Sequence, residues 1–166
     1  MYDIRLEGDA RALLRKLQNI SELDRRAISA DLAEVVGSST IERFRHSRAP
    51  DGQRWEPSRR ALLEGGKTLV KSAQLRNSIH AKADASGFAV GTNVEHAATH
   101  QFGEPGRTIR ARTKKALRFQ VGGRWISKKQ VRVTIPARPF LGLSEEDERE
   151  IRETVEDFFE EIGEGG

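Results

Sequence analysis

The sequence predicts an α+β fold in which a long N-terminal helix and a C-terminal helix pack on an antiparallel sheet, with a protruding basic β-hairpin. The first observation is a run from Ser21 to about His46 in which apolar residues recur at spacings of three and four. The second is a series of short strand-like runs, separated by turn residues, between positions 78 and 135. The third is an amphipathic run after Ser144, which can cap a helix rich in acids in its first turn.

With 166 residues, the chain is long enough for one domain with a hydrophobic core, and we expect a single domain over residues 1–166. It divides into an N-terminal strand and helices (1–47), a connector (48–68), a helix–hairpin–helix unit with a basic β region (69–143), and an acidic C-terminal helix (144–166). Cysteine is absent, which excludes disulfides and thiolate metal sites. No apolar run approaches the roughly 20 residues that span a bilayer, and the N-terminus lacks signal-peptide order, so we expect no membrane contact and a protein that stays where it is made.

The first half of the chain should be mainly helical. Residues 2–6 alternate as a short strand does, and Asp9 can cap a helix that carries Leu13, Leu14 and Leu17. Gly37 makes a kink plausible in the helix that follows Ser21, since glycine weakens a helix interior. Trp55 lies in a turn-rich segment and is expected to pack a loop onto the core. The glycine pair at 65–66 lacks the spacing of a phosphate-binding loop.

The second half should hold the strands. The turn 84–87 joins residues 78–83 to 88–92 as a hairpin, with Ser72 capping a short helix before it and Asn93 capping one after it that stops at Gly103. After a loop at 104–106, strands are predicted at 108–112, 116–121, 124–127 and 130–135. Pro136 and Pro139 then force an extended exit toward the last helix.

Charge divides the chain into two unlike parts. Residues 144–166 contain eleven acids and two bases, which leaves +13 for residues 1–143 when the net charge is +4. No acid occurs between Pro105 and Leu143, where eleven lysines and arginines are found. Such a split predicts a basic surface that meets something acidic.

Three interpretations of the basic β region stay open. Its charges, with Phe119 and Trp125 interleaved, can bind the acidic helix of a neighbouring subunit, keep an exposed β edge from aggregating, or contact nucleic acid. The acidic partners of a subunit contact would include Glu153, Glu156 and Glu160. The basic candidates are Arg110, Arg112, Lys114, Lys115, Arg118, Arg124, Lys128, Lys129 and Arg132.

No catalytic motif appears in the sequence, and we expect neither enzymatic activity nor a cofactor. His96 and His100 are spaced to share a helix face, but Ala97 stands where a zinc protease has its glutamate, and no third ligand is evident. We therefore interpret both histidines as packing or interface residues and predict no metal site.

An ordered series of motifs resembles the phage virion morphogenesis family, the tail completion proteins of tailed phages and Mu-like prophages. The series consists of D-G-x-x-W-x-P at 51–57, L-V-K-S-A-x-L-R-x-S-I at 69–79, F-A-V-G-T-N at 88–93, H-A-A-T-H-Q-F-G at 96–103 and I-P-A-R-P-F-L-G at 135–142. The resemblance covers roughly residues 38–148. It departs from the family at His96, where many relatives carry tyrosine.

The resemblance implies a structural protein of the virion tail or neck, a tail terminator that closes the finished tail for head–tail joining. Such proteins assemble in the host cytoplasm and form rings, commonly sixfold, on the tail tube. The implied partners are further copies of the chain, tail-tube and head–neck proteins, and DNA passing through the ring lumen. The family brings no catalytic residues. Its motif core here comprises Trp55, Leu75, Gly91, Gln101, Phe102, Gly103, Arg138, Pro139 and Phe140.

Overall fold

The helix predicted after Ser21 forms α2 (Glu22–His46) in the computed structural model, which describes residues 21–112, 115–121 and 123–164. Ser21 and Asp24 build a capping box, in which Ser21 Oγ accepts a hydrogen bond from the Asp24 N–H at 3.1 Å and Asp24 Oδ2 accepts one from the Ser21 N–H at 3.3 Å. The predicted strand at 2–6 and the helix with Leu13, Leu14 and Leu17 lie outside the described residues.

Gly37 lies within α2, which continues through it as one helix. A Cβ atom at this position would stand 3.6 Å from the Cβ of Ala81 in β1 (His80–Asp84). The glycine therefore marks the place where a strand crosses close to the helix, rather than a helix end.

The predicted hairpin is confirmed: β1 pairs antiparallel with β2 (Gly87–Gly91), and the ribbon lies against α2. The short helix before it is α4 (Gln74–Asn77). Its N-cap is Ala73 and not Ser72 as predicted, although Ser72 Oγ accepts from the Gln74 N–H at 3.4 Å. The helix after it, α5 (Ala97–Phe102), ends at Gly103 as predicted. Asn93 does not cap α5; the helix starts later, after His96.

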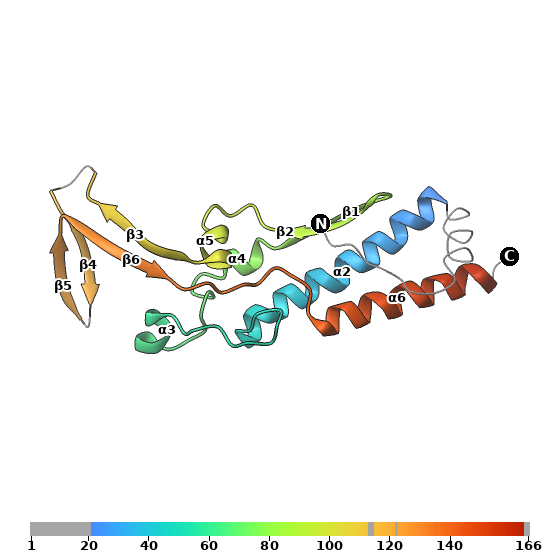
Figure 1. Ribbon diagram of the computed structural model, residues 1–166, viewed down its shortest axis with the longest axis horizontal. Helices are drawn as coiled ribbons and strands as arrows, with labels where there is room; N and C mark the ends of the chain where they lie inside the picture. The colour runs from blue at the N-terminus through green and yellow to red at the C-terminus, as the bar shows by residue number, and fades with distance from the viewer. Residues whose placement is uncertain (1–20, 113–114, 122, 165–166) are drawn as a thin grey trace.

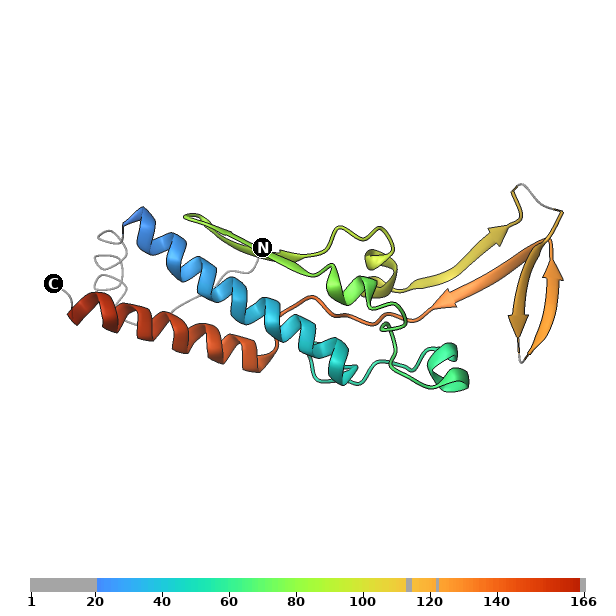
Figure 2. The ribbon, with the colours of Figure 1, turned by 180° about the vertical axis from the view of Figure 1, so that it is seen from behind.

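Two further ribbons form the part of the molecule that we call the arm. β3 (Glu104–Arg110) pairs antiparallel with β6 (Gln130–Ile135), and β4 (Leu117–Val121) pairs with β5 (Arg124–Lys128). Residues 104–106, predicted as a loop, belong to β3 because Gly106 (φ 75°) lies at a bulge that keeps the pairing with β6. The arm extends from one end of an elongated molecule, and the long helices lie at the other (Figures 1 and 2).

The last helix, α6 (Glu145–Glu164), directly follows Ser144, whose Oγ accepts a hydrogen bond from the Asp147 N–H at 3.1 Å. It packs along α2, because its apolar stripe needs an apolar surface and α2 provides one (Figure 1). The predicted α+β class is confirmed. In detail, however, the strands within the described residues form three separate two-stranded ribbons instead of one sheet, and α6 lies on α2 instead of on strands.

The core lies where the end of α2 meets the connector and the chain before α6. Phe44 and Phe140 are fully buried with ring centroids 5.2 Å apart, and Trp55 packs edge-on to Phe44 at 5.4 Å. Leu75 and Ile79 complete this cluster from the α4 side.

The connector also contains a short helix that sequence reasoning did not predict, α3 (Arg59–Glu64). It is capped by Ser58 Oγ, which accepts a hydrogen bond from the Ala61 N–H at 3.2 Å.

Candidate functional site

The segment between β6 and α6 is clasped by hydrogen bonds from distant parts of the chain. The Arg138 N–H donates to the carbonyl of His100 at 2.6 Å, and Arg138 Nε donates to the carbonyl of Glu56 at 2.7 Å. Trp55 Nε1 donates to the carbonyl of Pro139 at 2.8 Å. Trp55 thus packs in the core as predicted and also fixes the chain that leads into α6.

Gln101 holds the same segment from α5. Its Oε1 accepts from the N–H groups of Phe140 and Leu141, both at 3.0 Å, and its Nε2 donates to the Leu141 carbonyl at 3.0 Å. Gly103, at φ 73°, then lets the backbone pass so close to the segment that an added Cβ would stand 2.8 Å from the Ala137 nitrogen. We call this set of contacts the clasp.

The structure brings together most of the motif residues named from the sequence. Those at the clasp or in the core beside it are Trp55, Leu75, Gln101, Gly103, Arg138, Pro139 and Phe140. Two residues lie elsewhere. Gly91 pairs with His80 at the end of the β1–β2 ribbon, and Phe102 is 77% exposed.

A buried ion pair between Arg43 and Asp147 joins α2 to α6 beside the clasp. Arg43 Nη1 also donates to the carbonyls of Phe140 at 2.9 Å and Gly142 at 2.7 Å. Burial lowers the pKa of the Arg43 guanidinium below its usual range, while the charge of Asp147 and its hydrogen bond oppose that shift. Sequence reasoning missed this pair. The sequence did contain a hint of a structural role for Asp147, because it stands three positions after Ser144, where an acid can complete a capping box.

The basic interface candidates lie on the arm, apart from Lys114, which is outside the described residues. The others are exposed side chains of the two ribbons and the turns beside them. On the outer ribbon, the Arg118 guanidinium carbon is 5.4 Å from the ring centroid of Trp125, and Trp125 is 65% exposed. Within the described part of the arm, the ion pair is that of Arg107 with Glu104 at 3.3 Å, so most of its positive charge is unpaired.

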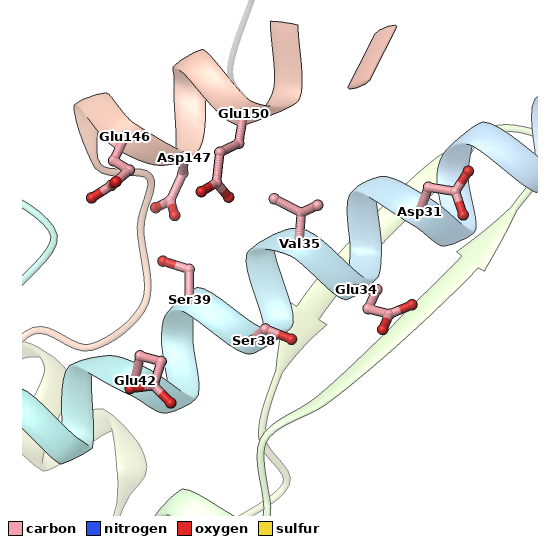
Figure 3. Close-up of a pocket in the computed structure, with 9 residues that line it drawn as sticks. All are labelled: Asp31, Glu34, Val35, Ser38, Ser39, Glu42, Glu146, Asp147 and Glu150. Carbon is pink, nitrogen blue, oxygen red and sulfur yellow. The ribbon is translucent and has the colours of Figure 1, made fainter. Parts of the chain in front are cut away.

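An acidic groove of about 610 Å³ runs between α2 and α6 (Figure 3). Its acidic side chains are Asp31, Glu34, Glu42, Glu146, Asp147 and Glu150. Asp147, Glu150 and Val35 point into the space between the two helices (Figure 3). With the exception of Asp147, which faces Arg43, the α6 acids here are exposed, so the groove presents concentrated negative charge to solvent.

The acidic interface candidates extend this negative surface along α6. Glu153, Glu156 and Glu160 are exposed, and their spacing of three and four places them on one face of the helix. None of them takes part in an ion pair among the described residues, where the pairs made by α6 are Arg149–Glu146 and Arg43–Asp147. The basic and acidic candidates thus lie on opposite ends of one elongated molecule (Figure 1).

Comparison with known sequences shows to which protein family the chain belongs. The sequence profile of the phage virion morphogenesis family matches residues 7–160. The chain belongs to the phage virion morphogenesis family. Its family membership assigns it a role in building the phage virion and makes it a virion-associated protein.

One relative of this phage morphogenesis protein is the Mu-like prophage FluMu G protein 2 of Haemophilus influenzae, which is 35% identical over 98 residues. The alignment covers 59% of this chain and 56% of the relative, so the chain spans little more than half the length of that protein. No solved structure is significantly similar to the chain.

His96, the N-cap of α5, and His100 within that helix have ring centroids 5.8 Å apart and rings nearly perpendicular. Burial lowers the pKa of His100, and the charges of His96 and Arg138 lower it further. Within the described ranges, no group of three or more histidine, aspartate or glutamate side chains is placed to hold a metal ion. No helix in these ranges is long and apolar enough to cross a membrane.

Proposed function

We propose that this protein completes the phage tail. It caps the tail end as a ring of identical subunits in the neck, contacts the tail tube and head–neck proteins, and prepares the tail for joining to the head, without catalysis or a cofactor. The family assignment and the motif series that resembles tail completion proteins support this role.

The observation that carries the ring is the separation of charge along the molecule. The arm presents unpaired basic side chains at one end, and the groove with α6 presents acids at the other. Two different patches on one chain make a heterologous contact, and repetition of that contact closes a ring when the rotation per subunit permits. Complementary charge would steer the encounter and fix its register.

The outer ribbon of the arm also needs a partner on physical grounds. Among the strands that the structure describes, β4 and β5 pair only with each other, and a lone two-stranded ribbon is marginally stable in water. An exposed tryptophan stacked on an arginine is the type of residue that anchors protein interfaces. We place this ribbon in the acidic groove of the next subunit.

Light scattering on the purified chain, over a range of concentration and salt, tests the proposal. We expect a discrete oligomer that dissociates as salt rises, because screening weakens contacts between exposed charges. Glu146→Lys with Glu150→Lys, at exposed acids of α6 that line the groove, should lower the oligomer mass. The control reverses Glu64 and Glu95, exposed acids outside α6 and the groove. Oligomer mass that stays the same in the α6 variant would refute this contact.

The second candidate is nucleic-acid binding by the arm, and the stack of Arg118 on the exposed Trp125 favours it. Bases stack on aromatic side chains, while lysines and arginines follow the phosphates. The two functions are compatible if DNA passes through the ring. A low oligomer order combined with DNA affinity that falls steeply with salt would favour this candidate over the ring.

A further inference from the structure

A small basic pocket lies at the middle of the molecule, between α3, the loop before α4, and α5. Its volume is about 210 Å³, and its polar side chains are Arg60, Lys71, Ser72, Gln74, His96 and His100, with two leucines completing the wall. All of these polar groups can donate a hydrogen bond, and none of the described residues that line the pocket is a carboxylate. We call it the waist pocket.

The two cationic groups of the waist pocket have no counter-charge among the described residues, and Arg60 is also held in place by hydrogen bonds. Arg60 Nη1 donates to the Gly65 carbonyl at 3.2 Å and Nη2 donates to the Lys67 carbonyl at 2.6 Å, so backbone oxygens orient the guanidinium. Neither Arg60 nor Lys71 belongs to an ion pair among the residues that the structure describes. The positive charge is therefore preorganised and available to a partner.

Two further features set the pocket apart from ordinary surface: a strained backbone and a buried histidine nitrogen without a partner among the described residues. Leu69 (φ 63°) and Ala73 (φ 55°) adopt the left-handed conformation at both ends of the segment that presents Lys71, and such strain is concentrated at binding sites. His100 Nδ1 is shielded from solvent and has no hydrogen-bond partner. Burial lowers the pKa of His100, and the charges of His96 and Arg138 lower it further.

We propose that the waist pocket binds a side-chain carboxylate from α6 of a second copy of this chain. The inference rests on the proposed ring and names a second contact within it. Among the residues that the structure describes, Glu153, Glu156 and Glu160 are exposed acids without a cationic partner, and the pocket holds cations without an acidic one. A carboxylate can accept two hydrogen bonds from a guanidinium, and the pocket offers room for one such group.

The order of features along the molecule allows this contact to form together with the arm contact. From one end to the other, Figures 1 and 2 show the arm, the α3–α5 waist, the start of α6 and the end of α6. If a second copy is shifted along this axis until its arm reaches the groove of the first copy, the waist of the second copy comes to lie near the C-terminal half of α6 of the first copy. A nucleic-acid backbone would instead need a continuous basic track.

Association of charge variants tests the inference. Lys71→Glu should weaken self-association at least about tenfold, since like charges across an interface are strongly unfavourable. Lys82→Glu, an equal change at an exposed position on β1, is the control and should have little effect. Adding Glu156→Lys to Lys71→Glu should restore association. An oligomer that survives Lys71→Glu but dissociates with Arg124→Glu and Lys128→Glu overturns this inference and leaves the ring standing.

A direct binding measurement covers the case in which the purified chain is monomeric and the ring proposal fails in solution. Glutarate and inorganic phosphate are titrated while the imidazole NMR signals of His96 and His100 are recorded. A saturable shift with glutarate, lost in Lys71→Glu and kept in Lys82→Glu, supports a carboxylate site. No saturable shift, or a response to phosphate alone, overturns it.

Discussion

The guanidinium of Arg43, near the end of α2, forms a buried ion pair with the carboxylate of Asp147 in the first turn of α6; the two side chains are 7% and 1% exposed. Asp147 Oδ2 also accepts from the Ser144 N–H at 2.7 Å, so one carboxylate caps its own helix and neutralises the arginine. Through the carbonyls of Phe140 and Gly142, Arg43 extends the contact to the clasp. The position of the acidic helix relative to the rest of the protein depends on this pair.

Replacing Arg43 should be strongly destabilising. Arg43→Met leaves the Asp147 charge buried without its partner, and breaking a buried ion pair in this way costs about 3–5 kcal/mol of unfolding free energy. Arg26→Met is the control, because Arg26 pairs with Glu22 at 2.8 Å on an exposed surface, where a pair contributes about 0.5 kcal/mol. Urea unfolding followed by circular dichroism measures both. Equal losses in the two variants would contradict the role of the buried pair.

Gly103→Ala tests the close passage of α5 past the clasp. The new methyl group would meet the Ala137 nitrogen at 2.8 Å, and Gly103 has φ 73° and ψ 172°, a region that only glycine adopts readily. We expect a loss of about 2–4 kcal/mol in unfolding free energy. Gly52→Ala also has positive φ, at 81°, but meets no atom within 4 Å, so it should cost about 1 kcal/mol. A Gly52 variant as unstable as the Gly103 variant would show that steric contact is unimportant.

Gln101→Ala removes three hydrogen bonds from the clasp at once. The N–H groups of Phe140 and Leu141 and the Leu141 carbonyl lose their partner, and we expect a loss of about 2–4 kcal/mol in chemical unfolding. Gln101→Glu keeps the acceptor for both N–H groups but faces the carbonyl with an oxygen, so its loss should be smaller. Gln120→Ala, which removes one exposed bond to the Gly123 carbonyl, is the control and should change stability by less than about 1 kcal/mol.

Most features set by neighbouring residues could be predicted from the sequence, although Asn93 does not cap α5 as expected, and contacts between distant segments could not be predicted. The capping of α2 by Ser21 and the turn before Gly87 depend on residues within a few positions, which pattern rules describe. The bond from Arg43 to the Phe140 carbonyl joins residues 97 positions apart. Likewise, the apolar stripe of α6 predicts a buried face but not whether that face meets a helix or a sheet.

The stability of the fold should depend on pH through His100. Burial, together with the charges of His96 and Arg138, lowers the pKa of this imidazole below its ordinary value of 6.5. The unfolded chain then binds the proton more readily than the folded chain, so the contribution is fully present above about pH 6.5 and is lost as the pH falls toward the folded pKa. His100→Gln should flatten the dependence of Tm on pH between 5 and 7.5.

Trp125→Ala should separate assembly from folding. The side chain is 65% exposed on the outer ribbon of the arm, so its removal should change unfolding free energy by less than about 1 kcal/mol. If Trp125 anchors the arm in the groove of the next subunit, the same variant should weaken self-association by about 2 kcal/mol, the loss typical of an interface hot spot. Leu62→Ala, at a position 70% exposed on α3, is the matched control and should retain full association. Sedimentation velocity and urea unfolding on both variants make the comparison, and a Trp125 variant that associates like wild type would exclude the arm as the main contact.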